Sequence, residues 1–185
     1  MRIEILSGSP RNDSVTHRVA IHLKKTWTDR TGHSVGIIDL RENDLPPMQT
    51  VFTSPASAPE QYRPLVQKMF QADAFILLTP EYNGSYTPAM KNLLDHFPKQ
   101  QHKPFGIVTA STGAFGGMRA ALQLQQLIFA LFGIGSPYML VIPAVDKKFD
   151  AEGKLVDDAF AKSIDVFINE YLWLAEKIVA EKIEA

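Results

Sequence analysis

The chain alternates short apolar runs with segments of helical periodicity, and this alternation constrains the fold more than any single motif does. Strands and helices that alternate with short connections build a parallel sheet, because right-handed crossovers return each strand beside an earlier one. We therefore expect an α/β fold, a doubly wound five-stranded parallel sheet with helices on both faces. The expected strands are residues 2–7, 34–40, 73–79, 104–111 and 138–142, and the expected helices are residues 14–29, 59–71, 88–97, 117–132 and 158–183.

Length, charge and cysteine content narrow the class of protein. The 185 residues fit one globular domain, residues 1–185, and the net charge of −1 disfavours nucleic acid or a membrane surface as partner. Cysteine is absent, and the histidines show no metal-ligand spacing, so neither a disulfide nor a metal site is expected. Redox chemistry would need a bound cofactor. With no leader-like start and no long apolar run, the expected location is cytoplasmic.

A polar turn follows the first expected strand and leads into the first expected helix, Ser7-Gly8-Ser9-Pro10-Arg11-Asn12-Asp13-Ser14. Backbone N–H groups and the positive end of the helix dipole meet at such a turn, which suits a phosphate group. Ser9, Ser14 and Thr16 add hydroxyl groups, and Arg11 adds a guanidinium that grips a phosphate through two parallel bonds. The alternative leaves Ser14 as a helix N-cap alone and Arg11 as a solvated side chain. The spacing matches neither a dinucleotide fingerprint nor a Walker-type loop.

Two further polar loops follow the third and fourth expected strands, at the edge where doubly wound sheets bind ligands. The first is Thr79-Pro80-Glu81-Tyr82-Asn83-Gly84-Ser85, whose backbone N–H groups, Tyr82 ring and Asn83 amide fit the edge of a flat heterocycle. The second is Ser111-Thr112-Gly113-Ala114-Phe115-Gly116-Gly117, which lets the backbone approach a ligand closely. An ordinary Asn-Gly turn and an interface role for Phe115 are the alternatives. Three loops at one edge predict a binding site better than any one motif.

Two other segments stand out. Residues 41–59 are rich in Pro, Ser and Thr and are long for a connection within a domain, which predicts either a flap over a site or a mobile loop. Residues 127–132, Leu-Ile-Phe-Ala-Leu-Phe, are apolar on all sides of the expected helix. That helix should therefore be buried by more than its own sheet, and a subunit contact would supply the cover.

Several motifs occur together along almost the whole chain: Gly8-Ser9-Pro10-Arg11 with Ser14, Pro80-Glu81-Tyr82-Asn83, Pro88 with Lys91-Asn92 and Asp95, Ser111 with Gly113 and Gly116-Gly117-Met118-Arg119-Ala120, and Phe149-Asp150 with Gly153-Lys154-Leu155. In this combination the chain resembles the NADPH-dependent FMN reductase family of flavodoxin-like proteins, which includes chromate, quinone and azo-dye reductases. Thr16, Thr87 and Gln125 depart from the pattern, where many members have Asn, Val and Arg.

The resemblance implies a flavodoxin-like fold with bound FMN, and hydride transfer from NADPH or NADH to the flavin. Electrons would then pass to a small acceptor, such as a quinone, free flavin, chromate, azo compound or metal ion. It also implies a homodimer or homotetramer with the flavin near the subunit contact. No catalytic side chain is expected, since the flavin carries the chemistry, and the preference for NADPH over NADH rests on the resemblance alone. The implied cofactor-binding residues are Ser9, Arg11, Ser14, Thr16, Pro80, Glu81, Tyr82, Asn83, Gly84, Ser111, Thr112, Gly113 and Gly116.

Two other functional classes stay open at this point. One is a flavodoxin-type electron carrier without NAD(P)H turnover, but such carriers are strongly acidic and lack an arginine in the phosphate turn. The near-neutral charge and Arg11 count against it. The other is a regulatory or scaffold protein on the same fold, since a fold does not determine a function.

Overall fold

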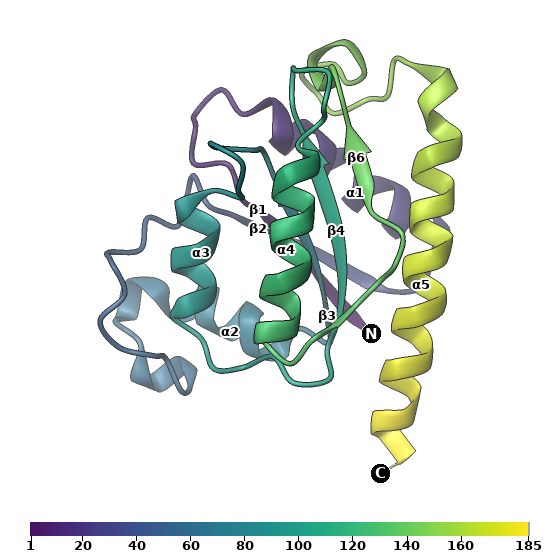
Figure 1. Ribbon diagram of the computed structural model, residues 1–185. Coiled ribbons are helices and arrows are strands. Elements are labelled where there is room, and N and C mark those ends of the chain that lie inside the picture. Colours follow the sequence, from purple (N-terminus) through teal and green to yellow (C-terminus); the bar gives the residue numbers. More distant parts are fainter. Residues whose placement is uncertain (185) are drawn as a thin grey trace.

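The computed structural model describes residues 1–184, with side chains described for residues 1–180, and it is built around a parallel sheet (Figure 1). The strands are β1 (Arg2–Ser7), β2 (Ser34–Asp39), β3 (Ala74–Thr79), β4 (Pro104–Ala110), β5 (Ile134–Gly135) and β6 (Leu140–Ile142). The helices are α1 (Val15–Arg30), α2 (Arg63–Gln71), α3 (Pro88–Asp95), α4 (Met118–Ala130) and α5 (Ala161–Glu184). The strand order is β2-β1-β3-β4-β5, with β6 also beside β4. This is the order of a flavodoxin-like, doubly wound fold, so the predicted fold class is confirmed.

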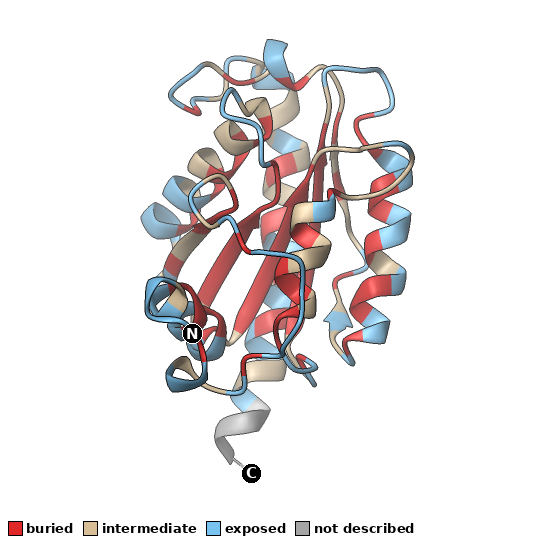
Figure 2. Ribbon diagram, turned by 90° about the vertical axis from the view of Figure 1, so that its left-hand side faces the viewer, coloured by how far each residue is buried: buried red, intermediate tan, exposed pale blue. Residues whose placement is uncertain are grey.

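Helices cover both faces of the sheet. Helices α1 and α5 pack on one face, and α2, α3 and α4 pack on the other (Figure 1). On the first face the rings of Trp27 in α1 and Tyr171 in α5 lie 5.8 Å apart. On the second face the rings of Phe75 and Phe105 stack at 5.3 Å. Every residue of β3 is buried, as expected for a central strand covered on both sides, and the strands form a buried layer in Figure 2.

The fifth position of the sheet differs from the prediction. One strand was expected over residues 138–142, but two short strands fill this position: β5 pairs with the start of β4 and β6 with its end. Pro137 lies between them, and a proline has no N–H group to donate to the sheet. The edge of the sheet is therefore interrupted at residues 136–139.

The first turns of two helices also differ from the prediction, whereas the start of α1 agrees with it. Ser14 is the N-cap of α1, as expected. The segment expected to be helical from residue 59 begins as a 3₁₀ turn at Glu60–Tyr62, and the last helix begins with a similar turn at Asp158–Phe160. Among the described helices, none is both long enough and apolar enough to cross a membrane.

The segment at residues 41–59, for which a flap or a mobile loop was predicted, is anchored against α3 at a few apolar residues. Leu45 and Phe52 are buried in the core. The Phe52 N–H donates to the His96 carbonyl at 2.7 Å, and the Asn92 amide donates to the Leu45 carbonyl at 2.9 Å. Leu45 and Phe52 are spaced along a stretch without helical or strand periodicity. Hydrophobic periodicity therefore could not predict this packing from the sequence.

Candidate functional site

The three predicted loops meet beyond the carboxyl ends of β1, β3 and β4 and enclose a cavity of about 230 Å³. We call this the main cavity. Its lining residues are Ser9, Arg11, Asp13, Ser14, Val15, Thr16, Pro80, Glu81, Tyr82, Ala110, Ser111 and Thr112. The structure thus brings most of the predicted site residues together. The other four, Asn83, Gly84, Gly113 and Gly116, lie on the same loops but are not among the lining residues.

The first loop is fastened to the sheet and to α3. The Gly8 N–H donates to the Leu78 carbonyl at 2.8 Å, and the Thr87 hydroxyl donates to the Gly8 carbonyl. A Cβ atom at Gly8 would lie 2.4 Å from the Met90 methyl carbon and 3.0 Å from the Leu78 oxygen, so only glycine fits without rearrangement. This close approach fixes the path of the loop towards α1.

Both interpretations of the phosphate turn have structural support. Ser14 accepts a hydrogen bond from the His17 N–H at 3.1 Å, so it is a helix cap. Its hydroxyl hydrogen remains able to bind a ligand. Ser9 and Thr16 are buried hydroxyl residues on the wall of the main cavity. The first-turn N–H groups of α1 lack carbonyl partners within the helix, so the turn offers donors to an anion.

Arg11 and Tyr82, both on the wall of the main cavity, are in contact with each other. The Arg11 guanidinium carbon lies 5.0 Å from the centroid of the Tyr82 ring, a cation–π contact between the first and second loops. The Tyr82 hydroxyl is buried and has no hydrogen-bond partner among the described residues. Buried polar atoms in folded proteins usually have a hydrogen-bond partner, so the Tyr82 hydroxyl marks an unmet hydrogen bond on the second loop.

The second loop turns tightly between Tyr82 and Ser85. These two residues exchange backbone hydrogen bonds of 2.8 and 3.1 Å. Asn83 and Gly84 between them have φ angles of 51° and 86°, the left-handed conformation that an Asn-Gly pair adopts most easily. The Asn-Gly turn considered as an alternative is therefore present, directly after Tyr82 on the wall of the main cavity.

Glu81 joins the second loop to the start of α4. Its carboxylate accepts hydrogen bonds from Arg119 Nε at 2.7 Å and from the Arg119 backbone N–H at 3.2 Å. Gly116 and Gly117, the two residues before the start of α4, have φ angles of 60° and 88°. A Cβ atom at Gly116 would lie 2.8 Å from the Pro143 nitrogen. Glu81 thus holds the third loop and α4 in place through its pairing with Arg119.

A polar cluster that the sequence analysis missed lies behind the phosphate turn. Arg41 donates from Nε and Nη2 to the Asp39 carboxylate at 2.6–3.0 Å, and from Nη1 to the Asn12 carbonyl at 3.1 Å. His17 Nδ1 lies 2.9 Å from the Ser7 hydroxyl and 3.4 Å from Asp39. The signal was available, since Asp39 ends β2 and Arg41 follows it, at the same edge of the sheet as the other loops.

Burial and the ion pair between Asp39 and Arg41 determine the protonation of this polar cluster. Burial lowers the pKa of His17, and the nearby Asp39 carboxylate offsets only part of this effect, so the imidazole is neutral at pH 7. Burial alone would raise the pKa of Asp39, but hydrogen bonds from Arg41 hold it below its usual value. The same pairing raises the pKa of Arg41. Among the described residues no group of three or more His, Cys, Asp or Glu side chains is placed to hold a metal ion.

Comparison with known proteins gives a consistent result. Residues 1–146 match the family described as NADPH-dependent FMN reductase. The chain is 32% identical over 169 residues to an NADPH:quinone oxidoreductase of Arabidopsis thaliana, covering 85% of this chain and 83% of the relative. It is 28% identical over 172 residues to an FMN-dependent NADPH-azoreductase of Staphylococcus haemolyticus, covering 90% of each. Among solved structures, the flavoenzyme NAD(P)H:(acceptor) oxidoreductase FerB of Paracoccus denitrificans superposes with a TM-score of 0.79 at 26% identity, covering 95% of this chain and 97% of FerB.

Proposed function

The chain belongs to the NADPH-dependent FMN reductase family, and from this premise we propose how its own residues serve the family's reaction. The protein is an FMN-dependent NAD(P)H oxidoreductase. When bound, FMN would supply the redox chemistry: acceptance of a hydride from NAD(P)H and electron transfer to a second acceptor. The observation that carries the assignment of the site is the meeting of the three polar loops in the main cavity.

The residues of the main cavity fit the two chemically different ends of FMN. Ser9, Ser14 and Thr16, with the first-turn N–H groups of α1, form the end that would hold the phosphate. Arg11, at the rim, would bind a phosphate oxygen while its guanidinium stays over the Tyr82 ring. The positive charge and the oriented donors of this turn favour a dianion over a neutral group.

The opposite end of the main cavity would hold the ring system. Pro80, Glu81 and Tyr82 on one loop and Ser111 and Thr112 on the other line this part of the main cavity. Backbone groups of these loops would bind the edge of the ring, and the unpartnered Tyr82 hydroxyl would find a partner there. Asn83, Gly84, Gly113 and Gly116 belong to this proposal as loop residues that shape the walls.

We further propose that the protein is a homo-oligomer formed through α4. Five large apolar side chains on or beside α4 are exposed, and we call them the α4 apolar face: Phe115, Met118, Leu122, Phe129 and Phe132. Phe115 and Phe129 are the most exposed of them, at 79% and 72%. A second copy is the occupant that the self-complementary stripe favours, because a two-fold axis pairs the stripe with itself. The acceptor would be a small molecule that reaches the flavin beside this contact.

The test of the proposed function is the visible spectrum of the purified protein, followed by NADPH oxidation with and without a quinone. We expect a yellow protein whose FMN is released on denaturation, and rapid NADPH oxidation once a quinone is added. A flavin-loaded protein that oxidises neither NADPH nor NADH would favour the electron-carrier alternative. A protein that takes up no FMN would favour the scaffold alternative.

Cytoplasmic location and a single domain over residues 1–185 are part of the same proposal.

A further inference from the structure

The phosphate turn, residues 7–14, does little to fix its own central part. Among the described residues, the backbone groups of residues 9–13 make no backbone–backbone hydrogen bond. The turn is fastened at Gly8 before this stretch and at the α1 cap after it. A stretch that is held only at its ends loses conformational entropy when it closes on a ligand. A group that fixes it beforehand would therefore raise the affinity for that ligand.

Arg41 is such a group. Its Nη1 donates to the Asn12 carbonyl at 3.1 Å, in the middle of the turn. No other hydrogen bond joins residues 9–13 to the rest of the described chain. The second contact of this stretch is the one between Arg11 and the Tyr82 ring, on the side of the main cavity. Arg41 thus holds the turn from behind.

Arg41 is itself fixed to the sheet. Its Nε and Nη2 donate to the Asp39 carboxylate at 2.6–3.0 Å, and its backbone N–H donates to the same carboxylate at 3.0 Å. The Asp39 side chain is only 7% exposed and belongs to the last residue of β2. Charge-assisted hydrogen bonds from a planar guanidinium have a defined geometry. Arg41 therefore links Asn12 to a rigid strand.

The same cluster also contacts the chain at both ends of the turn. Ser7 lies opposite Asp39 in the register of β1 and β2. The Ser7 hydroxyl lies 2.9 Å from His17 Nδ1, and this nitrogen lies 3.4 Å from Asp39. Ser7 begins the turn, and His17 lies in the first turn of α1 that follows it. The cluster around Asp39 therefore touches the turn at its start, in its middle and just after its end.

We propose that Arg41, anchored by Asp39, is a positioning residue for the phosphate of FMN. It holds Asn12, and with it the donors of residues 9–14, in the conformation that receives the phosphate. This inference rests on the proposed function, which assigns the phosphate to this turn. Arg41 is not among the lining residues of the main cavity, so it acts through Asn12 and not by contact with the ligand. Its effect is confined to the phosphate end of FMN.

The test compares FMN with riboflavin, which has the same ring system and no phosphate. Apoprotein is titrated with each flavin, and binding is followed by flavin fluorescence. Arg41→Ala should weaken FMN binding about tenfold, the factor for ordering roughly one more residue on binding, and riboflavin binding less than about twofold. Unchanged FMN affinity, or equal losses for the two flavins, would overturn the proposal. Wild-type protein that binds no FMN would refute the proposed function instead.

The matched control is Arg18→Ala. Arg18 and Arg41 line the same cavity behind the turn, but Arg18 Nη1 donates to the Phe149 carbonyl at 3.1 Å. This variant removes a guanidinium from the same surroundings and leaves the contact with Asn12 in place. It should keep the wild-type ratio of FMN to riboflavin affinity. A change as large as that of Arg41→Ala would mean that positive charge behind the turn is what matters, and the proposal would fail.

A double variant separates positioning from charge. Arg41→Ala leaves the Asp39 carboxylate unpaired, and a negative charge near the turn repels a phosphate. Asp39→Asn with Arg41→Ala removes that charge but leaves Asn12 without its hydrogen bond. FMN affinity should stay about tenfold below that of the wild type, whereas a return to wild-type affinity would overturn the proposal. The double variant also serves if Arg41→Ala folds poorly, because no unpaired carboxylate remains buried.

Discussion

Helices α1 and α4 begin at opposite sides of the main cavity and pack on opposite faces of the sheet, yet their outer surfaces differ. The exposed residues of α1 include Lys24, Lys25 and Asp29, and its first turn is capped by Ser14. The exposed residues of α4 include Leu122 and Phe129. A charged outer surface is stable in water, whereas an apolar stripe gains free energy by being covered. The outer surface of α1 therefore remains stable in contact with water, whereas the α4 apolar face is the surface on which the proposed subunit contact would form.

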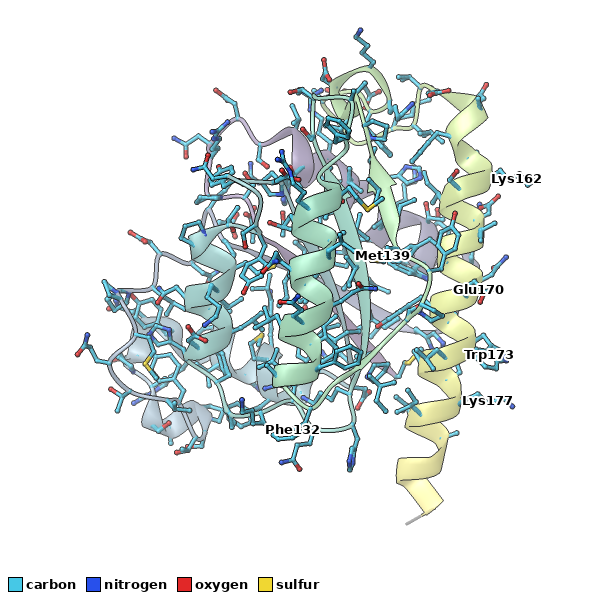
Figure 3. All side chains as sticks on the ribbon, viewed as in Figure 1. Phe132, Met139, Lys162, Glu170, Trp173 and Lys177 are labelled. Carbon is cyan, nitrogen blue, oxygen red and sulfur yellow. The ribbon has the colours of Figure 1, made fainter. Side chains whose placement is uncertain are left out.

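Helix α5 also has an exposed aromatic residue, but its surroundings differ from those of the α4 apolar face. Figure 3 shows Lys162, Glu170, Trp173 and Lys177 pointing away from the sheet along α5, and Trp173 is 62% exposed. Its neighbours on this stripe are charged, whereas the α4 apolar face carries five exposed apolar side chains, interrupted by glutamines between Leu122 and Phe129. A substitution at Trp173 is therefore a control for substitutions on the α4 apolar face.

The largest effect is expected from charges placed on the α4 apolar face. Leu122→Glu with Phe129→Glu would bury carboxylates in the subunit contact, at a cost of several kcal/mol for each, so the oligomer should dissociate. Light scattering coupled to size-exclusion chromatography measures the mass. Trp173→Glu on α5 should keep the wild-type mass. A double variant with unchanged mass would mean that the subunits meet elsewhere.

The next effect concerns the start of α4. Gly116→Ala should destabilise the protein by about 2–4 kcal/mol, because alanine is strained at a φ of 60° and its Cβ meets the backbone at residues 142–143. Gly113→Ala, in the same loop, places its Cβ 3.4 Å from the Ser111 hydroxyl oxygen and should cost less than about 1 kcal/mol. Urea unfolding of both variants checks the difference. Equal stabilities would contradict the geometry described for this turn.

A smaller effect is expected at the rim of the main cavity on the α1 side. Arg11→Ala should weaken FMN binding about tenfold to a hundredfold, because one charge-assisted hydrogen bond contributes roughly 1.5–3 kcal/mol. Tyr82→Leu should cause part of this loss of FMN affinity, because it removes the ring beneath the guanidinium. Tyr82→Phe keeps the ring and should therefore keep that part of the affinity, but it still lacks the hydroxyl contact. Fluorescence titration of apoprotein with FMN measures the affinity. Unchanged affinity in Arg11→Ala would refute the role of Arg11.

The smallest effect is expected at the cap of α1. Ser14→Ala removes the acceptor for the His17 N–H and should destabilise the protein by about 1 kcal/mol. If Ser14 also binds the phosphate, FMN affinity should fall in the same variant. A loss of stability with unchanged FMN affinity would leave Ser14 as a cap alone. Differential scanning calorimetry of the apoprotein and of the FMN-loaded protein distinguishes a loss of stability alone from a loss of FMN affinity.

The main cavity was predicted well because its residues follow strands in the sequence. In a parallel sheet, loops that come after the strands gather at one edge, so Ser9, Tyr82 and Ser111 had to lie near one another once the strands were assigned. The same rule applied to β2 would have found Asp39 and Arg41. Arg41 was missed because the segment after residue 40 was interpreted as a loop without structure, and Asp39 because it fell inside the expected strand.

What the sequence determined by itself was local or periodic: the strands, the helices, the cap at Ser14 and the order of the loops. These depend on neighbouring residues and on hydrophobic spacing, both of which can be read along the chain. Only the tertiary structure decided the break of the fifth strand at Pro137, the packing of residues 45–58 and the contact of Arg11 with Tyr82. It also brought Arg18 and Arg41 to one cavity. Contacts of this kind join residues far apart in the chain, and close packing, not periodicity, selects them.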